Sequence, residues 1–322
     1  MPDASHVRRE VAVVLPCYNV EACLARALDS VFAQTYTDFH TYAVDDGSLD
    51  GTVGILDTYA DRCSFVSQPH AGPGAARNRA IRMSGSRFVA FLDADDEWMP
   101  HKLERQVALL KKDTDLGLVC SLCAVYESGK QSGSSLCVPG VASSGKLFPH
   151  LTRNCFVFTP TVVVRRRCLE EVGLFNESLR VSEDFNLWLR IAARWKIALL
   201  PEVLAINHKR SGSLSAAISP EERLRSGVEA LEDVQRSCPD LTPSETRALR
   251  AALAERIYFH GSYLLSTAHT GPARQKLASV LQLQPFHWRA FAKFLFTFFP
   301  TQAYEFLASF RTRTAYGPLR DR

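Results

Sequence analysis

Long apolar runs are missing from this chain. No window of about 18 residues is both apolar and uncharged, which is the length that a membrane-spanning helix requires. The first six residues, Met1 to His6, are polar and lack the apolar core of a signal peptide. We therefore expect a cytoplasmic protein, which reaches a membrane only at the cytoplasmic face.

A large excess of either charge is also missing. The 322 residues include 38 Lys and Arg and 34 Asp and Glu, giving a formal net charge of +4. This balance does not favour a nucleic-acid partner, whose phosphates attract strongly basic proteins. The excess lies at the end of the chain, because residues 286–322 contain six basic and two acidic side chains.

The nine cysteines lack the arrangement of a disulfide framework or a zinc site. Nine is an odd number, and disulfide frameworks are typical of short secreted chains. Cys120 and Cys123 form a CxxC pair, but no second pair accompanies it. We expect mostly buried thiols in a reducing compartment.

Short apolar strands alternate with helical patterns in the first hundred residues. Such alternation predicts a mostly parallel sheet with helices on both faces. Ligands bind to these sheets beyond the carboxyl ends of the strands. The predicted strands are residues 11–15, 42–44, 65–66 and 87–92.

Carboxylates follow two of these strands. Asp45 and Asp46 come after the second strand, and Asp93, Asp95 and Asp96 come after the fourth. Right-handed crossovers bring both ends to one edge of the sheet. Carboxylate oxygens suit Mg²⁺ or Mn²⁺, which take one or two of them together with the oxygens of a diphosphate. The alternative is a solvated acidic turn that caps the next helix.

A glycine-rich loop, residues 70–80, enters a helix between the two acidic ends. Its glycines let backbone amides approach a ligand, and a helix N-terminus favours anions. It matches neither a Walker loop nor a G-x-G-x-x-G fingerprint, so an ordinary loop before a surface helix is the alternative. Beside the two acidic ends, the loop favours a metal–nucleotide site.

The second half of the chain is more mixed. We predict strands over 117–126, 161–164, 197–200 and 203–206, with a flexible insertion or hairpin over 128–145. Glu183 and Asp184 precede an apolar helical stripe, where N-terminal capping alone would explain them. Helical spacing covers 221–237, 244–267 and 273–283.

The last segment combines aromatic and basic residues. Trp288, Phe291, Leu295 and Phe299 share one helical face, with basic residues beside it. This pattern suits a helix lying on an anionic membrane, although packing of the aromatics on the α/β domain explains it equally. We expect four regions: a disordered N-terminus (1–10), an α/β domain (11–218), a helical region (219–285) and an amphipathic tail (286–322).

Five strings, in this order, resemble the motifs of family 2 glycosyltransferases of the GT-A fold, and together they cover roughly residues 10–215. The strings are Leu15-Pro16-Cys17-Tyr18-Asn19, Val44-Asp45-Asp46-Gly47-Ser48, Gly72-Pro73-Gly74-Ala75-Ala76-Arg77-Asn78, Phe91-Leu92-Asp93-Ala94-Asp95-Asp96 and Glu183-Asp184.

The resemblance implies a role for each matched residue. On the donor side, Pro16 and Tyr18 would line the pocket of the nucleotide base and Asp46 would bond the base. Arg77 would face the ribose or diphosphate, and Asp93 would contact the sugar. Asp95 of the D-x-D motif would hold Mn²⁺ or Mg²⁺, and Asp184 would be the catalytic base of an inverting reaction.

One stretch departs from the family pattern. Many relatives carry Tyr-Arg before a Ser-x-Ser that resembles Ser213-Leu214-Ser215, whereas Asn207 and His208 stand here. Lys209 or Arg210 could supply the missing charge, His208 could ligate the metal, or the run could be a solvated basic loop.

The combined prediction is an inverting, metal-dependent glycosyltransferase. It would transfer a sugar from a nucleotide-sugar, UDP-linked by first expectation, to a glycan or lipid-linked acceptor. The alternatives are a nucleotidyltransferase on a similar sheet, a catalytically inactive nucleotide-sugar-binding protein and a peripheral membrane anchor. The first would need a basic residue in the glycine-rich loop, which offers only His70 and Arg77.

Overall fold

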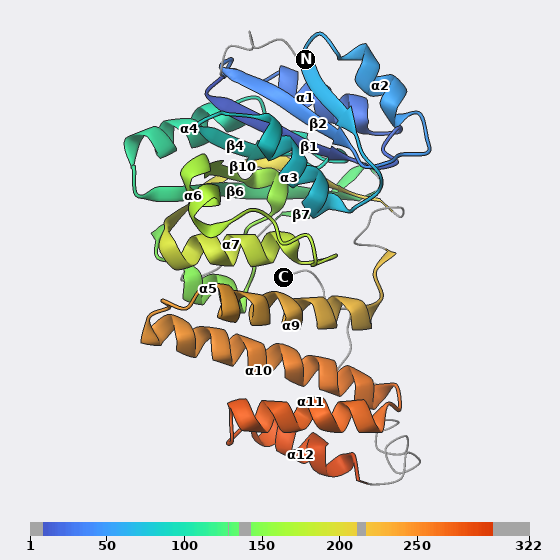
Figure 1. Ribbon diagram of the computed structural model, residues 1–322, viewed down its shortest axis with the longest axis vertical. Helices are drawn as coiled ribbons and strands as arrows, with labels where there is room; N and C mark the ends of the chain where they lie inside the picture. Colours follow the sequence, from blue (N-terminus) through green and yellow to red (C-terminus); the bar gives the residue numbers. More distant parts are fainter. Residues whose placement is uncertain (1–8, 128, 135–142, 211–216, 299–322) are drawn as a thin grey trace. The chain divides into compact units, whose positions relative to one another are not determined.

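The computed structural model describes residues 9–127, 129–134, 143–210 and 217–298 (Figure 1). The chain divides into two compact units, residues 1–213 and 214–322. The first is an α/β unit and the second is helical. Glu10 was expected within a disordered N-terminus, but it is bound by the Lys111 ammonium at 2.6 Å.

The described part of the first unit is built on one ten-stranded sheet with β1 (Val11–Cys17) inside it. The neighbours of β1 are β2 (Phe39–Asp45) and β4 (Phe88–Phe91), and both run parallel to it. The strand order is β3-β2-β1-β4-β9-β6-β10-β5, with β7 paired to β6 and β8 to β10. The other strands are β3 (Cys63–Ser67), β5 (Glu97–Trp98), β6 (Leu116–Glu127), β7 (Lys130–Ser134), β8 (Ser144–Gly145), β9 (Val163–Arg165) and β10 (Lys196–Lys209).

The sheet is parallel in two blocks. Strands β1 to β4 form one block and β6 with β10 the other, while β9 runs antiparallel to both β4 and β6. The two strands expected over 197–200 and 203–206 are one strand, β10. Its register against β6 shifts between Leu200 and Val203, which lets the pairing continue past Pro201.

Helices cover both faces of the sheet. Helices α1, α2 and α4 share one core with Val11, Val13 and Leu15 of β1. Because side chains alternate along a strand, Phe91 of β4 faces the other side, where its ring lies 5.6 Å from that of Trp188 in α7. The helices of this unit are α1 (Leu24–Phe32), α2 (Thr52–Thr58), α3 (Pro73–Met83), α4 (Lys102–Lys112), α5 (Phe148–Arg153), α6 (Arg166–Val172) and α7 (Glu183–Arg194), with a 3₁₀ turn at Thr159–Thr161.

The second unit packs four described helices in chain order, α9 on α10, α10 on α11 and α11 on α12. They are α9 (Pro220–Ser237), α10 (Pro243–Ser266), α11 (Thr270–Leu283) and α12 (Trp288–Phe296), close to the predicted bounds. A capping box at Thr242 and Glu245 starts α10. Within the described ranges, none of the helices has the length and apolarity needed to cross a bilayer.

Candidate active site

The two acidic strand ends flank the carboxyl end of β1, as predicted. Cys17 at the end of β1 pairs with Asp45 of β2, and Val14 pairs with Phe91 of β4. The residues that follow β2 and β4, Asp46 and Asp93, therefore leave the sheet at the same edge. This edge is the candidate site.

Asp46 holds the glycine-rich loop in place. Its side chain is buried, with only 2% of the residue exposed. The backbone amides of Ala71 and Gly72 donate to its two carboxylate oxygens at 2.9 and 2.8 Å, and the Gln68 amide donates at 2.7 Å. The His70 ring nitrogen Nδ1 also lies 2.8 Å from the carboxylate. Asp46 thus binds the glycine-rich loop, and its predicted hydrogen bond to the nucleotide base stays a prediction.

Tyr18 and His70 form an aromatic platform at this edge. Their rings are stacked with centroids 4.2 Å apart, and Tyr18 remains 42% exposed. The next residue, Asn19, has a left-handed backbone (φ 50°) and its side-chain oxygen accepts the Leu49 amide at 2.8 Å. Pro16 is partly buried at the end of β1. An exposed stacked ring is suited to receive a flat heterocycle.

The acidic cluster after β4 divides into a buried and an accessible part. Asp96 is 1% exposed, and its carboxylate accepts the Asn207 amide and the His208 backbone N–H. Burial, followed by the charges of Asp93 and Asp95, raises the pKa of Asp96 well above its ordinary value. Asp96 is therefore a structural acid, whereas Asp93 and Asp95 are partly exposed.

The basic run His208-Lys209-Arg210, at the end of β10, reaches this cluster. Arg210 Nε lies 2.9 Å from the Asp95 carboxylate, and His208 Nε2 lies 2.8 Å from Glu97. Arg210 therefore brings positive charge to Asp95, and His208 pairs with the neighbouring acid, Glu97. Ser213-Leu214-Ser215 lies outside the described residues. Within the described ranges, no group of three His, Cys, Asp or Glu side chains forms a ready ligand set for a metal.

Arg77 joins the acidic cluster to the start of α7. One terminal nitrogen lies 2.6 Å from Asp93 and the other 2.8 Å from Glu183, and the Arg77 side chain is only 6% exposed. Burial disfavours its charge, but the two carboxylates outweigh this effect and raise the Arg77 pKa. With both terminal nitrogens engaged, Arg77 positions two carboxylates, and a contact with the ribose or diphosphate stays a prediction.

Asp184 is held next to this bridge. Its Oδ2 accepts the Thr159 hydroxyl at 2.9 Å and its Oδ1 accepts the Phe185 amide at 2.6 Å. Ser182, just before the helix, is left-handed (φ 63°) and its side chain makes no capping bond. Such backbone strain in a non-glycine residue is tolerated where the surroundings fix it, often at a functional site.

Glu183 has an unusual electrostatic environment. Burial raises its pKa from the ordinary 4.5 to about 7, the charge of Asp184 adds to this, and Arg77 acts in the opposite direction. The folded chain therefore holds a proton on Glu183 at pH values where the unfolded chain has released it. Glu183 adds a pH-dependent group directly beside Asp184.

The free energy of unfolding is expected to vary with pH because of the raised pKa of Glu183. A folded-state pKa above the unfolded value means that stability falls as the pH rises from 4.5 towards 7. Glu183→Gln abolishes that dependence. The unfolding free energy of the variant minus that of the wild type should therefore rise by about 3 kcal/mol between about pH 4 and pH 8, at about 1.4 kcal/mol per pH unit.

Chemical denaturation across this pH range measures the difference. The same series on Glu202→Gln, which removes a surface carboxylate that is 46% exposed, corrects for the loss of one negative charge. If the unfolding free energy of Glu183→Gln minus that of the wild type does not change with pH, the raised pKa of Glu183 is contradicted.

Three residues of the site were not predicted from the sequence. Glu183 belongs to a motif string but was given no role other than helix capping, Thr159 belongs to no motif, and Arg26 of α1 donates to the Asp95 backbone oxygen at 2.8 Å. The Glu183-Asp184 string was the one available signal, since it places a second carboxylate beside the predicted base.

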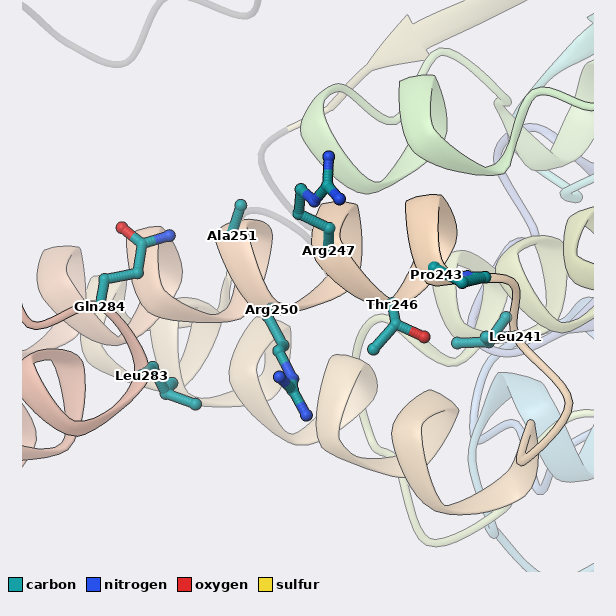
Figure 2. Close-up of a pocket in the computed structure, with 8 residues that line it drawn as sticks. All are labelled: Leu241, Pro243, Thr246, Arg247, Arg250, Ala251, Leu283 and Gln284. Carbon is teal, nitrogen blue, oxygen red and sulfur yellow. The ribbon is translucent and has the colours of Figure 1, made fainter.

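The helical unit has a cavity of about 510 Å³ that shares no residue with this site (Figure 2). It lies along α10 and the end of α11, lined by Leu241, Thr246, Ala251 and Leu283 among others. Arg247 and Arg250 leave α10 in opposite directions in Figure 2, so they do not converge on one anion.

The sheet order, the two acidic strand ends and the glycine-rich loop together define a GT-A fold. The model of the family "Glycosyl transferase family 2" matches residues 12–173. The chain belongs to glycosyl transferase family 2, which decides against the nucleotidyltransferase alternative.

The chain is similar to several known proteins. It is 31% identical over 192 residues to an uncharacterized glycosyltransferase of Rickettsia prowazekii, covering 56% of this chain and 58% of that protein. It is 31% identical over 183 residues to the Escherichia coli UDP-Glc:α-D-GlcNAc-diphosphoundecaprenol β-1,3-glucosyltransferase WfgD, covering 56% and 69%. The match thus spans less than two thirds of the length of the Rickettsia relative.

A solved structure of similar fold is that of S. aureus TarS 1-349 in complex with UDP. The TM-score is 0.64 at 19% sequence identity, and the match covers 97% of this chain and 95% of that chain. The predicted α/β GT-A fold with a helical C-terminal region is confirmed.

Proposed function

We propose that this protein is an inverting, metal-dependent glycosyltransferase that transfers a sugar from a UDP-sugar to a glycan or a lipid-linked acceptor. Family membership and the site geometry support this function. The names of two similar proteins agree with it, since WfgD uses UDP-Glc and a diphosphoundecaprenol-linked sugar, and TarS was solved with UDP.

One observation carries the proposal: the guanidinium of Arg77 bonds both Asp93 and Glu183. This bridge holds the donor end of β4 close to the start of α7, where Asp184 is the next residue. A base must sit near the anomeric carbon but on the face opposite the leaving diphosphate. Through Arg77, the carboxylate next to Asp184 in the sequence is bonded to Asp93 at the donor end of β4, which supports this arrangement.

In the proposed reaction, Asp184 takes the proton of the acceptor hydroxyl. The acceptor oxygen forms a bond to the anomeric carbon as the bond from that carbon to the diphosphate oxygen breaks, and the electron pair leaves with the nucleotide. General-base catalysis of this kind contributes about 10²–10⁴-fold. The Thr159 hydroxyl and the Phe185 amide orient the carboxylate, and the N-terminal end of α7 favours its negative charge.

Asp95 would hold a Mn²⁺ or Mg²⁺ ion at the diphosphate of the donor, and Asp93 would contact the donor sugar. The Asp95 carboxylate is partly exposed and offers the oxygen atoms that these ions prefer, and the neighbouring carboxylates of Asp93 and Asp96 favour an added cation. When bound, the metal would supply positive charge for the departing diphosphate. Arg26 holds the Asp95 backbone and Arg210 its carboxylate.

The donor platform is the stacked pair Tyr18 and His70 at the end of β1, beside Pro16. The glycine-rich loop, fixed by Asp46, forms the wall next to it. We place the enzyme at the cytoplasmic face of the membrane, where a lipid-linked acceptor would be reached.

Isothermal titration calorimetry of the purified chain tests the proposed function. UDP, GDP, CDP and dTDP are titrated in Mn²⁺ and then in EDTA. Metal-dependent binding of UDP is expected, with weaker or no binding of the other nucleotides. Failure of every nucleotide to bind with or without metal would falsify the proposal, because the acidic strand ends would then be structural.

A further inference from the structure

The 3₁₀ turn at Thr159–Thr161 is held from the interior of the α/β unit. The Trp98 indole N–H donates to the Pro160 backbone oxygen at 2.7 Å, and the Gln106 side-chain amide donates to the Thr161 backbone oxygen at 2.7 Å. Trp98 and Gln106 are both buried. Two consecutive carbonyl groups of the turn are therefore bonded by side chains of β5 and α4, and loss of either donor leaves a buried oxygen short of a partner.

This turn carries the hydroxyl that bonds the proposed base. Thr159, the first residue of the turn, donates to Asp184 Oδ2 at 2.9 Å. The turn is closed by its own backbone, since the Val162 amide donates to the Thr159 backbone oxygen at 3.1 Å. A shift of the Pro160 or Thr161 backbone would therefore move the Thr159 hydroxyl relative to the start of α7.

A buried lysine fixes the orientation of the Gln106 amide. Lys102, one turn earlier in α4, is fully buried, and its Nζ donates to the Gln106 side-chain oxygen at 2.7 Å. The same Nζ lies 4.2 Å from the centre of the Trp98 ring. Because Lys102 binds the amide oxygen, the amide nitrogen of Gln106 is directed to the Thr161 oxygen. Lys102, Gln106 and Trp98 thus form one buried set that contacts the turn.

Trp98 also connects this set to the acidic cluster. It lies three residues after Asp95 and pairs with Ala205 of β10. Its backbone amide donates to the Ser30 hydroxyl oxygen at 3.1 Å. Because both its backbone and its indole are bonded, Trp98 links the segment of the predicted metal ligand to the turn beside the predicted base.

We propose that Trp98 and Gln106 are positioning residues of the transfer reaction, which hold the turn whose Thr159 hydroxyl orients the Asp184 carboxylate. The inference rests on the proposed function and deepens it, because it names buried residues that set the geometry of the base. Displacement of a reacting group by about 1 Å costs on the order of 10²-fold in rate, so the hold on the turn is expected to be measurable in kcat.

A double-mutant cycle on kcat, measured with a UDP-sugar, tests the inference. Trp98→Phe keeps an aromatic ring without the indole N–H, and we expect kcat to fall about 10-fold with UDP affinity unchanged. Thr159→Val should lower kcat about 30-fold, whereas Thr159→Ser, which keeps a hydroxyl, should stay within about threefold of the wild type. The double variant of Trp98→Phe and Thr159→Val should be within about twofold of Thr159→Val alone, because Trp98 acts through that hydroxyl.

Trp195→Phe is the matched control. The Trp195 indole donates to Glu171 at 3.0 Å at an exposed site, so this variant loses the same group and should keep its kcat within about twofold of the wild type. Thermal denaturation measures the folding of each variant. Gln106→Met, which removes the amide that bonds Thr161, completes the same cycle if Trp98→Phe does not fold.

Three results would overturn the inference alone, in a wild type that binds UDP and turns over. They are a wild-type kcat in Trp98→Phe, a loss of UDP affinity that matches the loss of kcat, and losses that multiply in the double variant. The last would show that the indole acts independently of Thr159. A wild type that binds no UDP overturns the proposed function, and this inference with it.

Discussion

The Asp184→Asn enzyme is expected to bind UDP as the wild type does and to turn over about 10³-fold more slowly. Asparagine keeps the size of the side chain, and its oxygen can still accept the Thr159 hydroxyl or the Phe185 amide. What it loses is the ability to take the proton of the acceptor hydroxyl. The loss therefore falls on kcat, with donor affinity unchanged.

Steady-state kinetics with a UDP-sugar and calorimetry with UDP measure the two quantities separately. Asp115→Asn is a matched control, since this carboxylate is 67% exposed and pairs with Lys196 on β10. Its kcat should stay within about twofold of the wild type, as is usual for surface substitutions. A kcat for Asp184→Asn within fivefold of the wild type would remove Asp184 from the catalytic role.

Asp95→Ala is expected to weaken UDP binding in Mn²⁺ by at least about 100-fold. A divalent cation held by Asp95 would supply positive charge for the diphosphate of UDP, and a 100-fold loss of affinity corresponds to about 2.8 kcal/mol, at about 1.4 kcal/mol for each tenfold. The substitution leaves the Asp95 backbone oxygen that Arg26 binds. It removes only the carboxylate, which we expect to hold the metal and which Arg210 contacts at 2.9 Å.

The comparison with EDTA makes this test specific. Without metal, the wild type and Asp95→Ala should bind UDP equally weakly, because the side chain then has nothing to coordinate. Glu97→Gln, which alters the neighbouring acid that pairs with His208, should keep the metal effect. If Asp95→Ala weakens UDP binding equally with and without metal, the Asp95 side chain supports the structure of the site and does not hold a metal.

The edge of the sheet that carries the carboxylates could be predicted from the sequence because the change in residue type there is local. A buried strand gives way to carboxylates within one or two positions at Val44 to Asp45 and at Phe91 to Asp93, and this contrast needs no knowledge of the fold. The length of β10 was harder to predict. Pro201 indicates a break, yet pairing with β6 resumes after the register shift.

The bridge inside the site could not be predicted from local pattern. Arg77 and Glu183 lie 106 positions apart, and their contact depends on how α3 and α7 pack over the sheet. The same holds for Thr159, the first residue of the 3₁₀ turn, whose hydroxyl meets Asp184 only because this turn begins beside α7. The motifs identified the carboxylates of the site. Which of them have a structural role, as Asp46 and Asp96 do, depends on tertiary packing.

The way in which Asp46 fixes the glycine-rich loop matters for redesign of the donor site. Its carboxylate binds the backbone amides of Ala71 and Gly72, so the side chain at residue 71 takes no part in shaping the loop. A combinatorial library can therefore vary residue 71 while the backbone of the loop keeps its bonds to Asp46. Gly72, with φ 91°, must remain glycine, and Asp46 is the anchor that such a library has to keep.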